Sequence, residues 1–191
     1  MMDMIKKENV VLKLVNKKNV RAKELSVPYR NGINIVFRIP ITDGEAVIVT
    51  KDMFADVPVT DLLETAKRNT QAKYPIRIVG LGKMLALMMG AETDGCDDTY
   101  VVTNDSMVDG AATVLYPDFH ETIRRETGFE SYIIIPSSIH ELLIRPFEDV
   151  ETMEEILREV NAMPGCITDD IFLSDDLLIC SGGVITTAKD L

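Results

Sequence analysis

The residues of this chain that come closest to a catalytic arrangement lie in one short stretch, which runs from Ser137 to Glu141 and reads SSIHE. A serine hydroxyl becomes a nucleophile when a histidine accepts its proton, so Ser137 or Ser138 beside His140 predicts a hydrolase or a transferase. The stretch follows the apolar run 132–135, as nucleophile turns follow strands, but the GxSxG pattern of a nucleophile elbow is absent around it. Serine chemistry is therefore one of two interpretations.

The second interpretation of this stretch is structural. Ser138 and Glu141 match the S-x-x-E pattern of a capping box, in which both side chains bond to free backbone N–H groups at the start of a helix. This role accounts for the two residues without any chemistry. We therefore favour a helix start here, and keep Ser137, Ser138, His140 and Glu141 as the catalytic candidates of the alternative.

Other residues that could do chemistry are sparse. The second histidine, His120, lies in an expected helix, and the three cysteines, Cys96, Cys166 and Cys180, are an odd number at wide spacing. Such cysteines form neither a disulfide framework nor a CxxC metal site. We predict no metal and no cofactor, and we expect the reducing environment of the cytoplasm.

Membrane association is not expected. The longest apolar stretch, residues 84–89, is far shorter than the roughly 20 residues that span a bilayer. The first residues lack the apolar segment of a secretory signal.

Composition and charge narrow the classes of partner. The 191 residues carry 20 Lys and Arg against 31 Asp and Glu, a net charge of −11, and 46% of them are hydrophobic. This composition is globular, and the excess of carboxylates argues against nucleic acid, whose phosphates attract Lys and Arg. The basic stretch over residues 6–30 has few aromatic side chains on which bases could stack. This argues against a surface that binds single-stranded nucleic acid.

The charge is divided unevenly along the chain. Residues 1–90 carry a net charge of +6, whereas residues 91–191 carry −17. The two parts could neutralise each other within the fold, or each could present a binding face to a charged protein partner. The sequence leaves both interpretations open.

Hydrophobic periodicity predicts a mixture of strands and helices. Strands are expected over residues 10–15, 33–41, 45–50, 76–79, 100–104, 111–116, 132–135, 142–145, 171–173, 177–180 and 184–187. Helices are expected over residues 17–25, 58–74, 81–89, 118–127 and 149–162. This order predicts an α+β fold of antiparallel β-hairpins with helices packed on the sheet.

One order of elements occurs twice: strand, turn, strand, helix, strand, short helix. The first copy covers residues 33–89 and the second covers residues 100–143, and each expected hairpin carries Asp-Gly, at 43–44 and at 109–110. Two similar ββαβ units from a duplication would explain the pattern, and so would chance.

We predict a single domain over residues 1–191. The repeated order suggests two subunits within it, over residues 10–90 and 99–191.

A set of short motifs extends over most of the chain, from about residue 10 to residue 180. They lie at residues 17–28, 44–48, 59–70, 111–117, 135–141, 158–161 and 173–175. Together they resemble an uncharacterised domain-of-unknown-function family of gut anaerobic bacteria. The family implies no activity, cofactor or catalytic residue. The chain departs from it at residues 177–180, where the relatives tend to have an aromatic-rich strand.

The sequence predicts a non-catalytic interaction or accessory protein of the cytoplasm that binds a protein partner through a charged face. The alternative is the hydrolase or transferase built on Ser137 or Ser138 with His140. An enzymatic role is therefore left open, although the residues favour a non-catalytic one.

Overall fold

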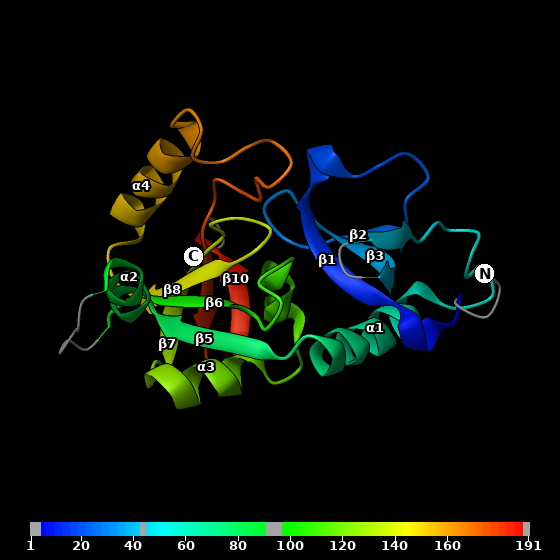
Figure 1. The fold of residues 1–191 in the computed structure, drawn as a ribbon, viewed down its shortest axis with the longest axis horizontal. Helices are drawn as coiled ribbons and strands as arrows, with labels where there is room; N and C mark the ends of the chain where they lie inside the picture. Colours follow the sequence, from blue (N-terminus) through cyan, green and yellow to red (C-terminus); the bar gives the residue numbers. More distant parts are fainter. Residues whose placement is uncertain (1–4, 43–44, 91–96, 189–191) are drawn as a thin grey trace.

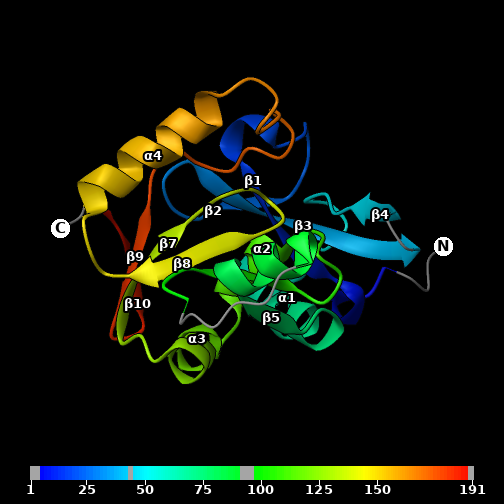
Figure 2. The ribbon, with the colours of Figure 1, turned by 60° about the vertical axis from the view of Figure 1, so that its left-hand side comes forward.

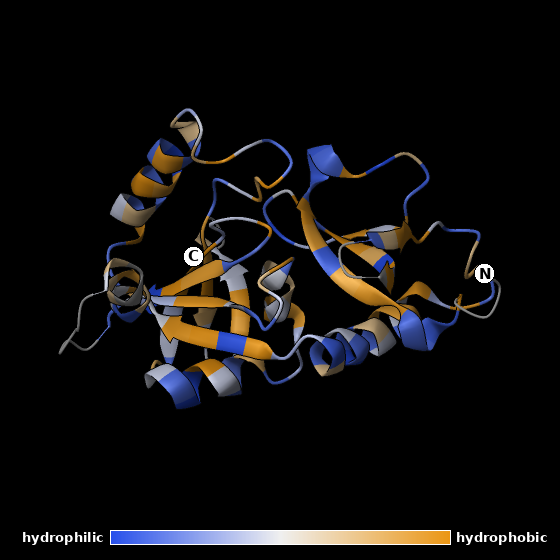
Figure 3. Ribbon diagram, viewed as in Figure 1, coloured by the Kyte–Doolittle hydropathy of each residue, from blue (hydrophilic) through white to orange (hydrophobic). Residues whose placement is uncertain are grey.

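Two antiparallel β-sheets form the framework of the protein, whose computed structural model describes residues 5–42, 45–90 and 97–188 (Figure 1). The α+β class and the antiparallel pairing expected from the sequence are confirmed. A cluster of buried apolar residues includes members of both sheets, such as Phe37 and Ile134. The strands of both sheets are accordingly rich in apolar residues, whereas helix α1 (Val59–Lys73) is mostly hydrophilic (Figure 3).

The first sheet is arranged around the long strand β3 (Ile33–Thr42). Strand β1 (Val11–Asn16) pairs with one edge of β3, and β2 (Ser26–Pro28) and β4 (Glu45–Ile48) pair with the other edge. The expected hairpin of β3 and β4 is confirmed, although its Asp-Gly turn at 43–44 lies outside the described residues.

The second sheet has six strands in the order β10-β9-β7-β8-β6-β5. Their bounds are β5 (Ile76–Gly80), β6 (Tyr100–Asn104), β7 (Ser131–Ile135), β8 (Leu142–Pro146), β9 (Leu178–Ser181) and β10 (Val184–Thr187). Strand β7 is buried over residues 132–135, as its uninterrupted apolar run predicts.

The helices lie where periodicity predicts them. They are α1, α2 (Leu81–Met89), α3 (Phe119–Thr127) and α4 (Val150–Ala162). Helix α1 buries Leu62, Ala66 and Thr70, which share one face, and the hydroxyl of Thr70 accepts the N–H of Leu12 at 2.9 Å. That bond fixes α1 along the edge of β1.

The second expected hairpin is wrong. The strand expected over 111–116 is replaced by the 3-10 helix η4 (Gly110–Leu115), which is buried at every position. Asp109 precedes it in the left-handed region, at φ 56°, and a Cβ at Gly110 would contact the Thr103 hydroxyl and the His140 carbonyl. A short apolar run buried on all sides has no periodicity that distinguishes a strand from a helix.

The two-unit hypothesis loses its basis with that hairpin. The second expected ββαβ order lacks its second strand, because η4 stands there. The first order is divided between the sheets, since β3 and β4 belong to the first and β5 to the second. An expected subunit boundary near residue 90 therefore does not coincide with the boundary between the sheets.

Two smaller expectations also differ from the structure. The helix expected over 17–25 is only the 3-10 turn η3 (Lys17–Asn19), and residues 171–173 are not a strand. A further 3-10 turn, η2 (Lys7–Asn9), precedes β1. The segment 17–25 has too few apolar residues to form a buried helical face.

Asparagine side chains fasten the irregular segment 163–177 to the first sheet. The Asn16 amide, at the end of β1, donates to the Leu173 carbonyl at 2.9 Å, and the Asn31 amide donates to the Leu177 carbonyl at 3.2 Å. From α4, the Asn161 amide donates to the Ser174 carbonyl at 3.2 Å. Figures 1 and 2 show this segment, in orange, running from the end of α4 toward the blue turn that follows β1.

Replacing Asn16 tests this fastening. Asn16 is 7% exposed and Leu173 is fully buried, so Asn16→Ala leaves a buried carbonyl without its partner. We expect a loss of about 1–3 kcal/mol in the free energy of unfolding, measured with urea. The control is Asn34→Ala on β3, whose side chain has no hydrogen bond among the described residues. Equal losses in the two variants would contradict the proposed role of Asn16.

Candidate functional site

The stretch from Ser137 to Glu141 forms a loop between β7 and β8 and does not begin a helix. The expected helix start is therefore wrong. The hydroxyl of Ser138, which is 6% exposed, accepts the N–H of His140 at 3.1 Å, and the hydroxyl of Ser137 lies 3.4 Å from a carboxylate oxygen of Glu141. Strand β8 begins immediately afterwards because Leu142 and Ile144 alternate into the core.

The imidazole of His140 supports a neighbouring turn. Its Nδ1 accepts the N–H of Asp109 at 3.2 Å, and its backbone carbonyl accepts the hydroxyl of Thr103 at 2.7 Å. Within residues 97–188, the two hydroxyls of the SSIHE loop bond elsewhere, so the hydroxyl–imidazole bond that activates a nucleophile is missing there. The imidazole of His140 therefore supports the backbone of Asp109.

Asp109 joins the basic part of the chain to the acidic part. Its carboxylate lies 2.8 Å from the ammonium group of Lys13 on β1. The other ion pairs among the described residues each stay within residues 1–90 or within residues 91–191. Ion pairs between residues 1–90 and residues 91–191 therefore neutralise little of the opposite net charges of these two parts.

The Lys13–Asp109 pair lies in a cleft with a volume of about 730 Å³. The walls come from β1, β3 and β4, from the end of α1, and from the loop 104–109 after β6. Four cations line the cleft, namely Lys13, Arg21, Arg38 and Lys73, against the carboxylates of Glu45 and Asp109. We call this the basic cleft.

Two of the four cations have a carboxylate partner. Lys13 pairs with Asp109, and Arg38 pairs with Glu24, whose side chain is fully buried. Burial of a carboxylate requires such a partner, and the backbone N–H of Arg21 adds a bond to Glu24 at 2.8 Å. Of this pair, Arg38 is the member that lines the cleft.

The other two cations are available. Arg21 and Lys73 have no ion pair with any carboxylate in the described part of the chain. The ammonium of Lys73 lies 5.7 Å from the ring centroid of Tyr74, a cation–π distance, and both residues line the cleft. A cleft of this size with two unpaired cations suits a negatively charged ligand.

Sequence reasoning missed this convergence. Lys13 and Arg21 belong to the basic stretch 6–30, but Arg38 and Lys73 come from β3 and α1. The pairing of Val11 with Arg38 across β1 and β3 brings the guanidinium into the cleft. The only early signal was the excess of cations in residues 1–90.

A second group of reactive side chains lies in the second sheet. The ring Nδ1 of His120 is 3.5 Å from Sγ of Cys180 and 3.4 Å from the hydroxyl of Tyr132. Burial raises the pKa of the Cys180 thiol and that of the Tyr132 phenol. Nearby Tyr29 is partly buried, and desolvation raises its pKa to about 12. The thiol therefore stays protonated and is a poor nucleophile.

Metal sites and membrane spans are also missing from the described ranges. No three side chains of His, Cys, Asp or Glu converge in residues 5–42, 45–90 and 97–188 as a metal ion would require. No helix in the same ranges has the length and apolar character needed to cross a membrane.

The chain belongs to the family of unknown function DUF5688, because the model of that family matches residues 2–178. The resemblance expected from the motifs to a family without an assigned activity is thereby confirmed. No curated protein and no solved structure matches the chain.

Thiol labelling tests the assignment of Cys180 as an inert residue. Cys180 is fully buried and Cys166 is exposed, so in a Cys96→Ser background a maleimide should label Cys166 rapidly and Cys180 only after unfolding. Mass spectrometry of the digested protein locates the label. Cys166→Ser in the same background is the control, and its native form should stay unlabelled. Rapid labelling of Cys180 in the native protein would show that its thiol is accessible.

Proposed function

We propose that this member of the DUF5688 family is a non-catalytic interaction protein whose basic cleft binds an acidic segment of a protein partner. The observation that carries the proposal is the pair of cations, Arg21 and Lys73, that have no carboxylate partner among the described residues. They line a cleft in a protein whose net charge is −11. A localised positive site on such a protein attracts carboxylates selectively.

The distribution of charge favours a protein partner over nucleic acid. Residues 91–191 carry a net charge of −17, and only the Lys13–Asp109 pair connects the two parts among the described ion pairs. A nucleic acid extends far beyond one cleft, so its phosphates would meet this acidic part. A short acidic segment contacts the cleft alone.

Serine chemistry is not part of the proposal. It would need the imidazole of His140 to accept the proton of Ser137 or Ser138, whereas Nδ1 already accepts the N–H of Asp109. Because His140 braces the Asp109 turn, its role in the proposal is to position the carboxylate that pairs with Lys13.

We place the protein in the cytoplasm. Cys166 is exposed as a free thiol and Cys180 is buried as one, which suits a reducing compartment.

Charge reversal in the cleft tests the proposed function. The probes are short fluorescein-labelled peptides of equal length that are rich in Glu, in Ser or in Lys. We expect the Glu-rich peptide to bind best, and its affinity to fall with salt. Arg21→Glu with Lys73→Glu should weaken it by about tenfold or more, measured by fluorescence anisotropy.

The matched control is Arg125→Glu, which reverses an exposed cation on α3 that pairs with Glu126. It should leave the affinity for the Glu-rich peptide unchanged. Equal binding of all three peptides would contradict the proposal, as would an equal loss in the control variant. Salt-dependent binding of a labelled DNA strand in preference to the peptides would assign the cleft to nucleic acid instead.

A further inference from the structure

We infer that the acidic segment carries a large apolar residue, such as Leu or Met, which packs against the loop 104–109 at the rim of the basic cleft. This inference rests on the proposed function and adds the chemistry of the partner. It depends on how the loop is held, on which side chains it exposes, and on what lies across the cleft.

The loop is held rigidly by the side chain of Asn104, which is 3% exposed. The side-chain Oδ1 of Asn104 accepts the N–H of Ser106 at 3.0 Å and its hydroxyl at 2.7 Å, and the side-chain Nδ2 of Asn104 donates to the carbonyl of Val108 at 2.9 Å. The backbone N–H of Met107 donates to the Asn104 carbonyl at 2.9 Å. The shape of the loop is therefore set before any partner binds.

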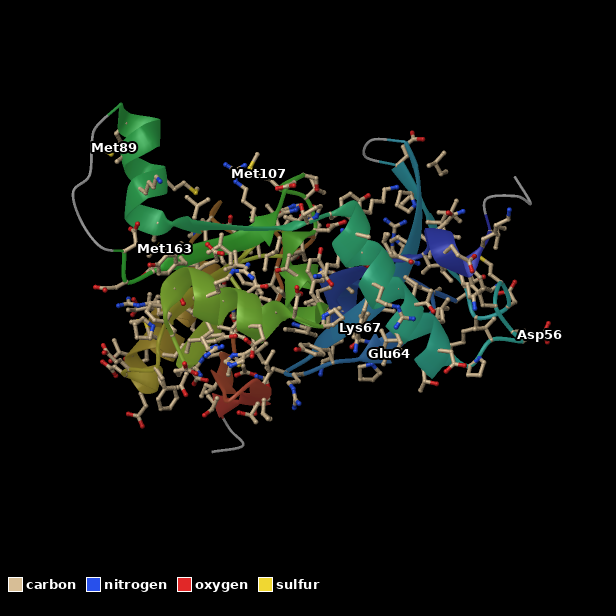
Figure 4. The ribbon with its side chains drawn as sticks, turned by 90° about the horizontal axis from the view of Figure 1, so that it is seen from below. Asp56, Glu64, Lys67, Met89, Met107 and Met163 are labelled. Atoms are coloured by element: carbon tan, nitrogen blue, oxygen red, sulfur yellow. The ribbon has the colours of Figure 1, made fainter. Side chains whose placement is uncertain are left out.

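The tip of this rigid loop exposes apolar side chains. Met107 is 61% exposed and Val108 is 53% exposed, and Figure 4 shows Met107 projecting from the ribbon. Met107 also has a φ of 55°, in the left-handed region where glycine is preferred. Neither the positive φ of Met107 nor the exposure of its side chain to water contributes to the stability of the fold. Flexible methionine side chains are common at surfaces that bind apolar groups.

Apolar surface continues on another wall of the same cleft. Ile41, near the end of β3, is 48% exposed and lines the cleft together with Val108. The available cations Arg21 and Lys73 line the same cavity. A segment that complements both properties carries carboxylates beside an apolar residue.

A second copy of this chain is the main competing occupant. Helix α4 is rich in Glu and exposes Ile156 and Val160, so it also combines acidic and apolar side chains. We favour a separate partner because the cleft accepts a short segment, whereas α4 is a helix of 13 residues whose Leu157 is packed in its own fold.

Two peptides of equal charge test the inference. Both are rich in Glu, and one has Leu at its centre where the other has Ser. We expect the Leu peptide to bind about tenfold tighter, because burial of one such side chain accounts for that factor. Met107→Gly and Val108→Ser should each remove most of this difference.

Met107→Gly separates binding from folding. Glycine adopts a positive φ without strain, so the urea midpoint of this variant should equal or exceed that of the unmodified protein while the Leu peptide binds less tightly. The control is Met163→Ser, which removes a half-exposed methionine beyond α4 and should change neither affinity.

Each remaining outcome has a distinct meaning. Equal affinity for the two peptides would overturn the inference and leave the proposed function standing, provided that charge reversal still weakens both. If neither peptide binds, both proposals fail. A salt-sensitive dimer in light scattering, abolished by Arg21→Glu with Lys73→Glu, would make a second copy the occupant and overturn the inference.

Discussion

The structure depends on how the backbone carbonyl groups of the irregular segment 163–177 find hydrogen-bond donors. A segment without strand partners must find donors for its buried carbonyl groups, and here asparagine amides provide them. Asn16 and Asn31 are in or next to strands of the first sheet, whereas Asn161 belongs to α4 beside the second. The same hydrogen bonds that satisfy the segment therefore tie the two sheets together and allow one apolar core to continue between them.

In addition to these hydrogen bonds, one ion pair connects the two sheets in the basic cleft. Lys13 projects from β1 of the first sheet, and Asp109 comes from the loop after β6 of the second. Asp109 is held in a left-handed conformation by the ring of His140. His140, which the sequence presents as a catalytic candidate, thus has a structural role. Its ring accepts the backbone N–H of Asp109 and so orients the Asp109 carboxylate in the cleft.

Local patterns predicted much of the fold. The alternation in 33–41 and the helical spacing in α4 each have a single structural solution. Residues 111–116 do not, because burial on every side erases the alternation. The candidate site was harder to predict, since Arg38 and Lys73 reach the cleft only through the pairing of β3 with β1 and the packing of α1. Such long-range contacts leave no local signature.

The electrostatics of the ionisable groups separate binding from catalysis. A catalytic thiol needs a lowered pKa, yet burial raises the pKa of Cys180 although His120 lies 3.5 Å away. The cations Arg21 and Lys73 line the basic cleft and are exposed to water. Solvated charges of one sign attract an opposite charge. This arrangement supports the proposal that the basic cleft binds an acidic segment.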